Sequence, residues 1–167
     1  MIRRKTKKKI VEVCVPNLWA FMRQHDMHTH DRMVWLHIVT GDHNEGLPGL
    51  FRLTESQIEA CTDIHLTGED TNCDFSVTDV VQWAVERFVE KDILRVDDEA
   101  GLMMIPNAIG HRPPRDEGEA RAWARMAFAL PESELVDDWR EEFVEACETC
   151  PDLRQHFESE WLGLCGE

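Results

Sequence analysis

Four side chains near the C-terminal end have residue types and a spacing that could bind zinc. Cys147 and Cys150 have the C-x2-C spacing of a zinc knuckle, and His156 and Cys165 lie downstream and complete a set of four ligands. The two cysteines of the pair also continue an apolar helical stripe that includes Phe143, so we interpret them as small core residues. We predict no metal here, and zinc is the alternative.

A second group of possible metal ligands consists of histidines. His25, His28 and His30 are closely spaced, and His37 follows them. A metal would require these rings to converge. Because residues 21–31 are polar overall, we expect a surface turn that leads into a helix rather than a metal site.

Catalytic motifs are absent from the sequence. It contains no Walker-type phosphate loop, no Gly-x-Ser-x-Gly elbow and no tyrosine. Acidic pairs such as Asp137-Asp138 are expected on a solvated helix face when acids are this abundant. We predict a non-catalytic protein that carries no cofactor.

The charge is distributed unevenly along the chain. The 167 residues carry 33 acids and 18 bases, a formal net charge of −15. Six of the bases lie within residues 1–10, so residues 11–167 hold 12 bases against 33 acids, a net charge of −21. The sequence therefore predicts a basic arm followed by an acidic body.

Composition excludes several classes of protein. An apolar content of 43% is too high for a disordered chain, and no apolar run approaches the roughly 20 residues that cross a bilayer. Glu12 interrupts the apolar stretch after the basic arm, which is unlike a secretory signal. We expect a cytoplasmic protein that does not associate with membranes and whose six cysteines are reduced thiols.

The pattern of apolar residues predicts an order of elements up to residue 105. Helical periodicity is clearest over residues 77–89, where apolar residues recur at i, i+3, i+4, i+7, i+8, i+11 and i+12. The expected elements are a strand at 10–15, a helix at 31–40, an extended piece at 50–53, a helix at 55–61, a loop at 62–75, the helix at 77–89, and a hairpin of 93–96 with 102–105. This order is the winged helix-turn-helix topology, with the hairpin as the wing.

The remaining chain is predicted to be helical. Apolar spacing indicates three amphipathic helices, around residues 120–128, 136–150 and 153–161. We therefore predict an α+β protein made of a winged helix-turn-helix domain and a helical C-terminal region, which is either packed on that domain or held as a second one. The predicted parts are a basic arm (1–10), the winged helix-turn-helix domain (11–108), a linker (109–118) and the C-terminal region (119–167).

Several motifs carry a resemblance to a known family. They are Val34–Gly41, Leu47–Phe51, Val81–Asp97, Met103–Ala108 and Leu130–Leu135. In these segments the chain resembles helix-turn-helix replication proteins of phages and other mobile elements, of the replisome-organiser or initiation type. The resemblance implies binding of origin or template DNA and recruitment of replication machinery, without catalysis.

DNA binding would need cations and polar groups at the expected contact surfaces. The third helix of such a fold enters the major groove, and the wing lies near the phosphates. The predicted DNA contacts are the six bases of the arm, the start and edge of the helix at 77–89, and the linker arginines: Arg3, Arg4, Lys5, Lys7, Lys8, Lys9, Thr78, Gln82, Arg87, Arg112 and Arg115.

The same surfaces also carry acids, which suggests a different partner. The side of the 77–89 helix opposite its apolar stripe contains Asp79, Trp83, Glu86 and Glu90, and the wing tip contains residues 97–99, all acidic. The alternative function is therefore a protein-interaction module, an adaptor or an inhibitor that imitates the charge of DNA, which uses the Trp83 side. Trp83 is either an interface anchor or covered by the 62–75 loop or a C-terminal helix.

Overall fold

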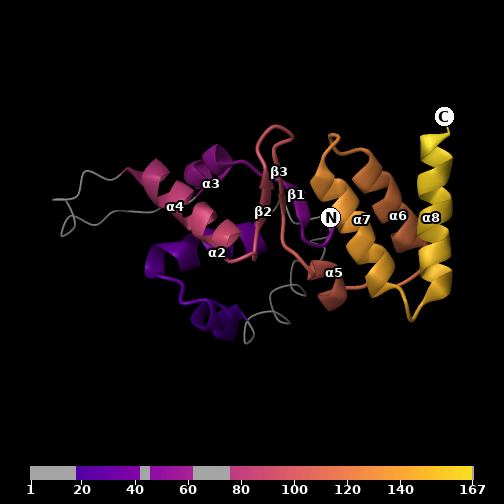
Figure 1. Ribbon diagram of the computed structural model, residues 1–167, viewed down its shortest axis with the longest axis horizontal. Coiled ribbons are helices and arrows are strands. Elements are labelled where there is room, and N and C mark those ends of the chain that lie inside the picture. Colours follow the sequence, from indigo (N-terminus) through magenta and orange to yellow (C-terminus); the bar gives the residue numbers. More distant parts are fainter. Residues whose placement is uncertain (1–17, 42–45, 62–75, 167) are drawn as a thin grey trace, which may run out of the picture.

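One small sheet lies between two groups of helices in the computed structural model, which describes residues 18–41, 46–61 and 76–166 (Figure 1). The basic arm, the expected strand at 10–15 and the expected loop at 62–75 lie outside the described residues. The described elements form an α+β fold: a helix over residues 18–24, α2 (Thr29–Thr40), β1 (Leu50–Arg52), α3 (Glu55–Cys61), α4 (Val77–Glu90), β2 (Arg95–Asp97), β3 (Leu102–Met104), α5 (Ala108–His111), α6 (Glu117–Phe128), α7 (Glu134–Ala146) and α8 (Pro151–Cys165).

The three strands form an antiparallel sheet in the order β1-β3-β2. Phe51 and Val96 both pair with Met103, so these three side chains share one face of the sheet. Their neighbours along the strands, Leu50, Leu102 and Met104, point to the other face. Both faces are apolar, and each one contributes to a separate hydrophobic core.

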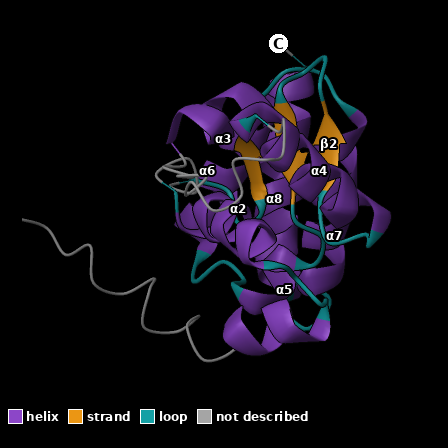
Figure 2. Ribbon diagram, turned by 90° about the vertical axis from the view of Figure 1, so that its left-hand side faces the viewer, coloured by secondary structure: helices purple, strands orange, loops and turns teal. Residues whose placement is uncertain are grey.

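The first core lies between the sheet and the N-terminal helices. Figure 2, a view from the side of these helices, shows α2 and α4 in front of the strands. The α4 helix presents Val81, Ala84 and Phe88, all essentially inaccessible to solvent. Ser76 caps α4, because its hydroxyl accepts a hydrogen bond from the Asp79 amide (3.2 Å). The predicted helix is therefore confirmed, although Val89 at the end of its apolar stripe is exposed.

The second core lies between the sheet and the C-terminal helices. Leu102 and Met104 of β3 are buried in one cluster with Trp123 of α6 and Phe143 of α7. The Trp139 indole in α7 donates a hydrogen bond to the Pro48 carbonyl, 2.8 Å away, just before β1. The C-terminal helices are thus packed on the sheet, which was one of the two predicted arrangements.

The α6 and α8 helices run side by side in the same direction. Glu117 at the start of α6 contacts His156 near the start of α8, and Arg125 near the end of α6 pairs with Glu160 further along α8. Beyond these pairs, the rings of Phe128 and Trp161 meet edge to face, 5.6 Å apart. Figure 1 shows α8 as the outermost element of this end of the molecule.

The structure corrects the expected surface turn at residues 21–31. Residues 18–24 form a helix, and both Met22 and Met27 are buried in the first core. Their burial explains why a segment of polar composition folds against the protein. The next helix begins at Thr29, two residues before the predicted start, because the His28 amide donates a hydrogen bond to the Asp31 carboxylate (3.1 Å).

Two further expectations in the C-terminal half are wrong. The expected linker at 109–118 contains the end of α5, whose Ile109 is fully buried in the second core. Cys150 does not continue a buried stripe: α7 ends at Ala146 and Pro151 begins α8, so this thiol is exposed while Cys147 is buried. Among the described helices, none has both the length and the apolar character needed to cross a membrane.

Candidate functional site

The outward side of α4 carries the residues that the sequence assigned to partner contacts. The helix packs onto α2 and α3 through its apolar stripe, which leaves Gln82, Trp83, Glu86 and Glu90 exposed. Trp83 keeps 38% of its surface accessible, and the 62–75 loop, one of the elements expected to cover it, lies outside the described residues. The large aromatic side chain is therefore partly exposed, on the same side of the helix as Glu86 and Glu90.

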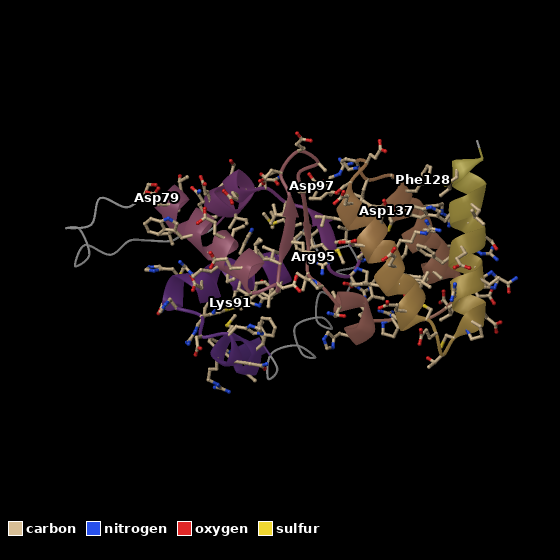
Figure 3. All side chains as sticks on the ribbon, in the orientation of Figure 1. Asp79, Lys91, Arg95, Asp97, Phe128 and Asp137 are labelled. Carbon is tan, nitrogen blue, oxygen red and sulfur yellow. The ribbon has the colours of Figure 1, made fainter. Side chains whose placement is uncertain are left out.

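Carboxylates from three elements meet beside this helix. Burial raises the pKa of Glu55, at the start of α3, above its ordinary value. Negative charges from the tip of the β2–β3 hairpin (the predicted wing), from α3 and from α4 raise that pKa further, and they come from Asp98, Glu59 and Glu86. We call these four residues, together with Asp79, the acidic face. Figure 3 shows Asp79 of α4 and Asp97 of the wing toward the same upper side of the molecule.

One side-chain hydrogen bond connects α4 to α3 at the acidic face, and a second one lies within α4. The Thr78 hydroxyl donates a hydrogen bond to the Glu59 carboxylate (3.2 Å), and the Gln82 amide donates to Glu86 (2.9 Å). Thr78 and Gln82 were predicted to contact DNA bases. In the structure each of them donates to a carboxylate of the face, which places polar groups on an anionic surface.

Arg87, also a predicted DNA contact, is used inside the fold. Its guanidinium forms a two-pronged ion pair with Asp31 of α2, with Nε 3.2 Å from Oδ2 and Nη2 bonded to Oδ1. Asp31 is buried, with 2% of its surface exposed. Removing the arginine would leave a buried carboxylate without its counter-ion, so its first role is structural.

The arginines of the expected linker share one internal partner. The Arg112 guanidinium lies 3.4 Å from Glu119 in α6, and that of Arg115 lies 3.9 Å from the same carboxylate. The Arg115 amide also donates to Glu119, at 2.8 Å. The positive charge of the two linker arginines is therefore neutralised in part by α6. The six predicted contacts of the arm, residues 3–9, lie outside the described residues.

The wing is attached to α7 rather than projecting from the fold. The Ser133 hydroxyl, at the start of α7, donates to the Asp97 carboxylate (2.5 Å), and Arg95 pairs with Asp138 (2.9 Å). Hydrogen bonds from Ser133 and from the Ala100 amide lower the pKa of Asp97. An open cleft of about 360 Å³ separates the wing tip from the first turn of α7.

The four residues that were considered as alternative zinc ligands do not come together. Cys150 and Cys165 lie at opposite ends of α8, about 22 Å apart at 1.5 Å per residue. His156 has other partners, because its Nε2 is 3.0 Å from Glu117 and its Nδ1 is 2.8 Å from Arg121. Within the ranges 18–41, 46–61 and 76–166, no three histidine, cysteine or acidic side chains are grouped to hold a metal ion.

The histidines near α2 also have separate surroundings. The His25 ring lies against the ring of Phe21, with their centroids 4.4 Å apart. The backbone carbonyl of His25 accepts a hydrogen bond from Lys91, which follows α4. His28 precedes α2 and takes part in its N-terminal cap. These contacts connect the 18–24 helix to α2 and α4.

Sequence reasoning missed the contribution of α3 to the acidic face. Glu55 and Glu59 are four residues apart, which places them on one side of a helix, and this spacing was an available signal. The contacts Ser133–Asp97 and Trp139–Pro48 could not be predicted from the sequence, because 36 and 91 residues separate the partners.

No family model matches this chain, and neither does any curated protein or any solved structure. The resemblance to replication proteins of mobile elements stays a prediction for this reason. Function has to be inferred from the chemistry of the described residues.

Proposed function

We propose that this protein is a non-catalytic, cytoplasmic interaction module of the winged helix-turn-helix type, whose acidic face binds a positively charged protein partner. One observation carries the proposal: carboxylates of α3, α4 and the hairpin tip lie near one another, and α4 carries Trp83 three residues from Glu86 on its exposed side. An acidic surface around an aromatic side chain is suited to a basic, amphipathic segment of another protein.

The order of elements supports the winged-helix part of the proposal. Along the chain α2, β1, α3 and α4 precede the β2-β3 hairpin, and β1 completes a sheet with that hairpin. In this arrangement α4 is the helix that would enter a DNA groove. Among the described elements, α4 packs through the opposite side, where Val81, Ala84 and Phe88 are buried.

Duplex DNA is a poor fit to the same surface. Phosphates repel carboxylates, and DNA affinity derives largely from lysine and arginine contacts. In the described part of the chain, the three arginines expected to supply such contacts are Arg87, Arg112 and Arg115, and each is paired with a carboxylate. The charge of the face therefore favours a basic protein over a nucleic acid.

The test measures binding of a fluorescein-labelled, 18-residue amphipathic peptide of lysine and leucine by fluorescence anisotropy. We expect the Glu86→Gln, Asp98→Asn double variant to bind roughly 5-fold more weakly, because two exposed ion pairs are lost. Trp83→Ala should weaken binding roughly 10-fold, as expected for an aromatic anchor. The matched control, Glu148→Gln with Asp152→Asn, removes the same charge from exposed positions in the turn before α8 and in the first turn of α8, and should leave binding unchanged.

Two results would contradict the proposal: no binding by the native protein, or equal losses in the test and control variants. The second result would mean that the peptide senses net charge only. Circular dichroism of each variant establishes that the helices are retained.

A second candidate function is DNA binding of the mobile-element replication type. The order of elements and the six bases of residues 3–9 favour it. It predicts that a labelled 20-base-pair duplex binds the full chain, with log K falling by about 0.9 per phosphate as log salt rises. Replacing the six bases with glutamine should then abolish duplex binding.

A further inference from the structure

We propose that Cys147 and Cys150 form a peroxide-sensitive modification site, in which Cys150 is oxidised first and Cys147 then closes an intramolecular disulfide. The two thiols lie between α7 and α8, so the inference goes beyond the proposed function and does not rest on it. Figure 1 shows this turn at the lower edge of the C-terminal helices. The C-x2-C spacing, which does not build a metal site, therefore supports a different chemistry.

The backbone of the turn brings the two cysteines within reach of each other. The Cys150 amide donates a hydrogen bond to the Cys147 carbonyl (2.9 Å), which closes a four-residue turn. The Cα atoms at the ends of such a turn lie less than about 7 Å apart, and a disulfide needs about 4.4–6.8 Å. The Cys147 amide donates to the Phe143 carbonyl (3.1 Å), and Pro151 begins α8 directly after Cys150. A disulfide is therefore compatible with the positions of both helices.

The two thiols differ in their access to solvent, which assigns them different roles. Cys150 is exposed, and among the described residues its sulfur has one weak hydrogen-bond contact, the Thr149 hydroxyl at 3.9 Å. Cys147 is buried in the second core, with 1% of its surface exposed. Burial raises the pKa of the Cys147 thiol, and the charge of the nearby Cys150 raises it further. A dissolved oxidant therefore reacts at Cys150, while Cys147 stays a protonated thiol.

The reaction proceeds in two balanced steps. The Cys150 thiolate attacks one oxygen of hydrogen peroxide, the O–O bond breaks, and a sulfenic acid and a hydroxide ion form. The sulfur of Cys147 then attacks the sulfur of Cys150, the S–O bond breaks, and the departing hydroxide takes the proton of the Cys147 thiol and leaves as water. One peroxide is reduced for each disulfide that forms. Dithiothreitol reverses the change by exchange and becomes a cyclic disulfide itself.

The experiment treats the full-length protein with hydrogen peroxide, blocks the remaining thiols with iodoacetamide and maps the tryptic peptides by mass spectrometry. One peptide, residues 141–154, contains Cys147 and Cys150 and no other cysteine. We expect this peptide to be two hydrogens lighter and to accept no iodoacetamide. Dithiothreitol added before the blocking step should restore both alkylations.

Cys165 is the matched control within the same chain. It is exposed like Cys150 but lies at the opposite end of α8, about 22 Å away at 1.5 Å per residue. Because Cys150 and Cys147 are too far away to react with it, oxidation of Cys165 should stop at the sulfenic acid, which dimedone captures.

Two variants assign the roles of the two thiols. In Cys147→Ala the closing thiol is missing, so dimedone labelling of Cys150 should rise roughly 10-fold over the native protein. In Cys150→Ser, peroxide should leave Cys147 unmodified, because burial protects it. Circular dichroism establishes that each variant keeps its helices, and if Cys147→Ala does not fold, the native peptide map decides.

Three results would overturn the inference. The first is a peptide 141–154 that still accepts two iodoacetamide groups at a peroxide dose that oxidises Cys165. The second is dimedone labelling of Cys150 in the native protein as strong as in Cys147→Ala. The third is a disulfide that joins Cys150 to any cysteine other than Cys147 of the same chain. None of these results would affect the proposed function, which concerns other residues.

Discussion

Two buried tryptophans differ in the hydrogen bonding of their indole N–H groups. Trp139 donates its indole N–H to the Pro48 carbonyl, whereas the N–H of Trp35, which is also buried, has no hydrogen-bond partner among the residues that the structure describes. An unsatisfied buried donor costs about 1–3 kcal/mol, so replacing Trp35 removes that cost together with some apolar contact. We expect Trp139→Phe to lower the free energy of unfolding by about 1–3 kcal/mol more than Trp35→Phe, measured by urea denaturation. Equal losses would contradict the difference in hydrogen bonding.

Gly49 is the position where the backbone tolerates no side chain. Its φ is +75°, and a Cβ placed on it would lie 2.3 Å from the Ala108 Cβ and 2.8 Å from the Ile105 carbonyl oxygen. Strain and overlap together predict that Gly49→Ala costs about 3 kcal/mol and lowers Tm by roughly 6–12 °C. Gly110→Ala is the control, because a Cβ there meets no atom within 4 Å. Similar Tm values for the two variants would show that the turn relaxes.

At the scale of elements, Ser133 connects the wing to α7. Its hydroxyl caps α7 by accepting from the Leu135 amide (3.2 Å) and donates to Asp97. Ser133→Ala should cost about 1 kcal/mol through the cap and raise the pKa of Asp97 toward its ordinary value. In the native protein the ionised Asp97 carboxylate stabilises the fold at pH values above the ordinary pKa of aspartate. This contribution is lost as the pH falls through the lowered pKa of Asp97 in the folded protein.

The deficit of Ser133→Ala should therefore be largest at pH 7 and smaller near pH 3, when both are measured by urea denaturation. Ser133→Thr keeps the hydroxyl and should retain most of the native stability. A deficit that does not change with pH would indicate that the cap alone is affected.

Local elements were predictable where residue spacing alone determines them. The α3 helix and its cap follow from Thr54 and Gln57, whose side chains and amides exchange hydrogen bonds as expected. The 18–24 helix was missed although Leu18, Phe21 and Met22 lie at i, i+3 and i+4, because the helix has only seven residues and its pattern is short. Cys150 was placed wrongly because the apolar periodicity continues across residues 147–150, where the helix is interrupted. The α7 helix ends at Ala146, and Pro151 begins α8.

The candidate site was only partly predictable. The α4 residues were assigned correctly to an exposed side, since a helical stripe defines its opposite. The engagement of Arg87 by Asp31 was not predictable, because it depends on the packing of helices whose paired residues lie 56 positions apart. Whether a surface suits DNA depends on whether its arginines and lysines are already paired with carboxylates. This pairing is determined by the folded structure and cannot be counted from the sequence.

At the scale of the whole molecule, the sheet connects the N-terminal helices and the C-terminal helices, which the sequence analysis assigned to two separate parts. Its first face belongs to the core that contains Phe51 and Met103, and its second face to the core that contains Leu50, Leu102 and Met104. Burial of each such side chain contributes about 1.5–3 kcal/mol, and a folded protein is stable by only about 5–15 kcal/mol. Loss of either group of helices would remove an amount comparable to the whole stability.

We therefore expect the two cores to unfold together. The indole N–H signals of Trp35 in the first core and Trp139 in the second should disappear at the same urea concentration in NMR spectra. A chain that ends at residue 115, before α6, should show no cooperative unfolding transition, because the second face of its sheet would be exposed. Separate midpoints for the two indoles, or a cooperative transition in the shortened chain, would show that the helices of the C-terminal region form an independent domain. A common midpoint would instead mean that a ligand bound at the acidic face stabilises α6, α7 and α8 as well, since all of them unfold in the same step.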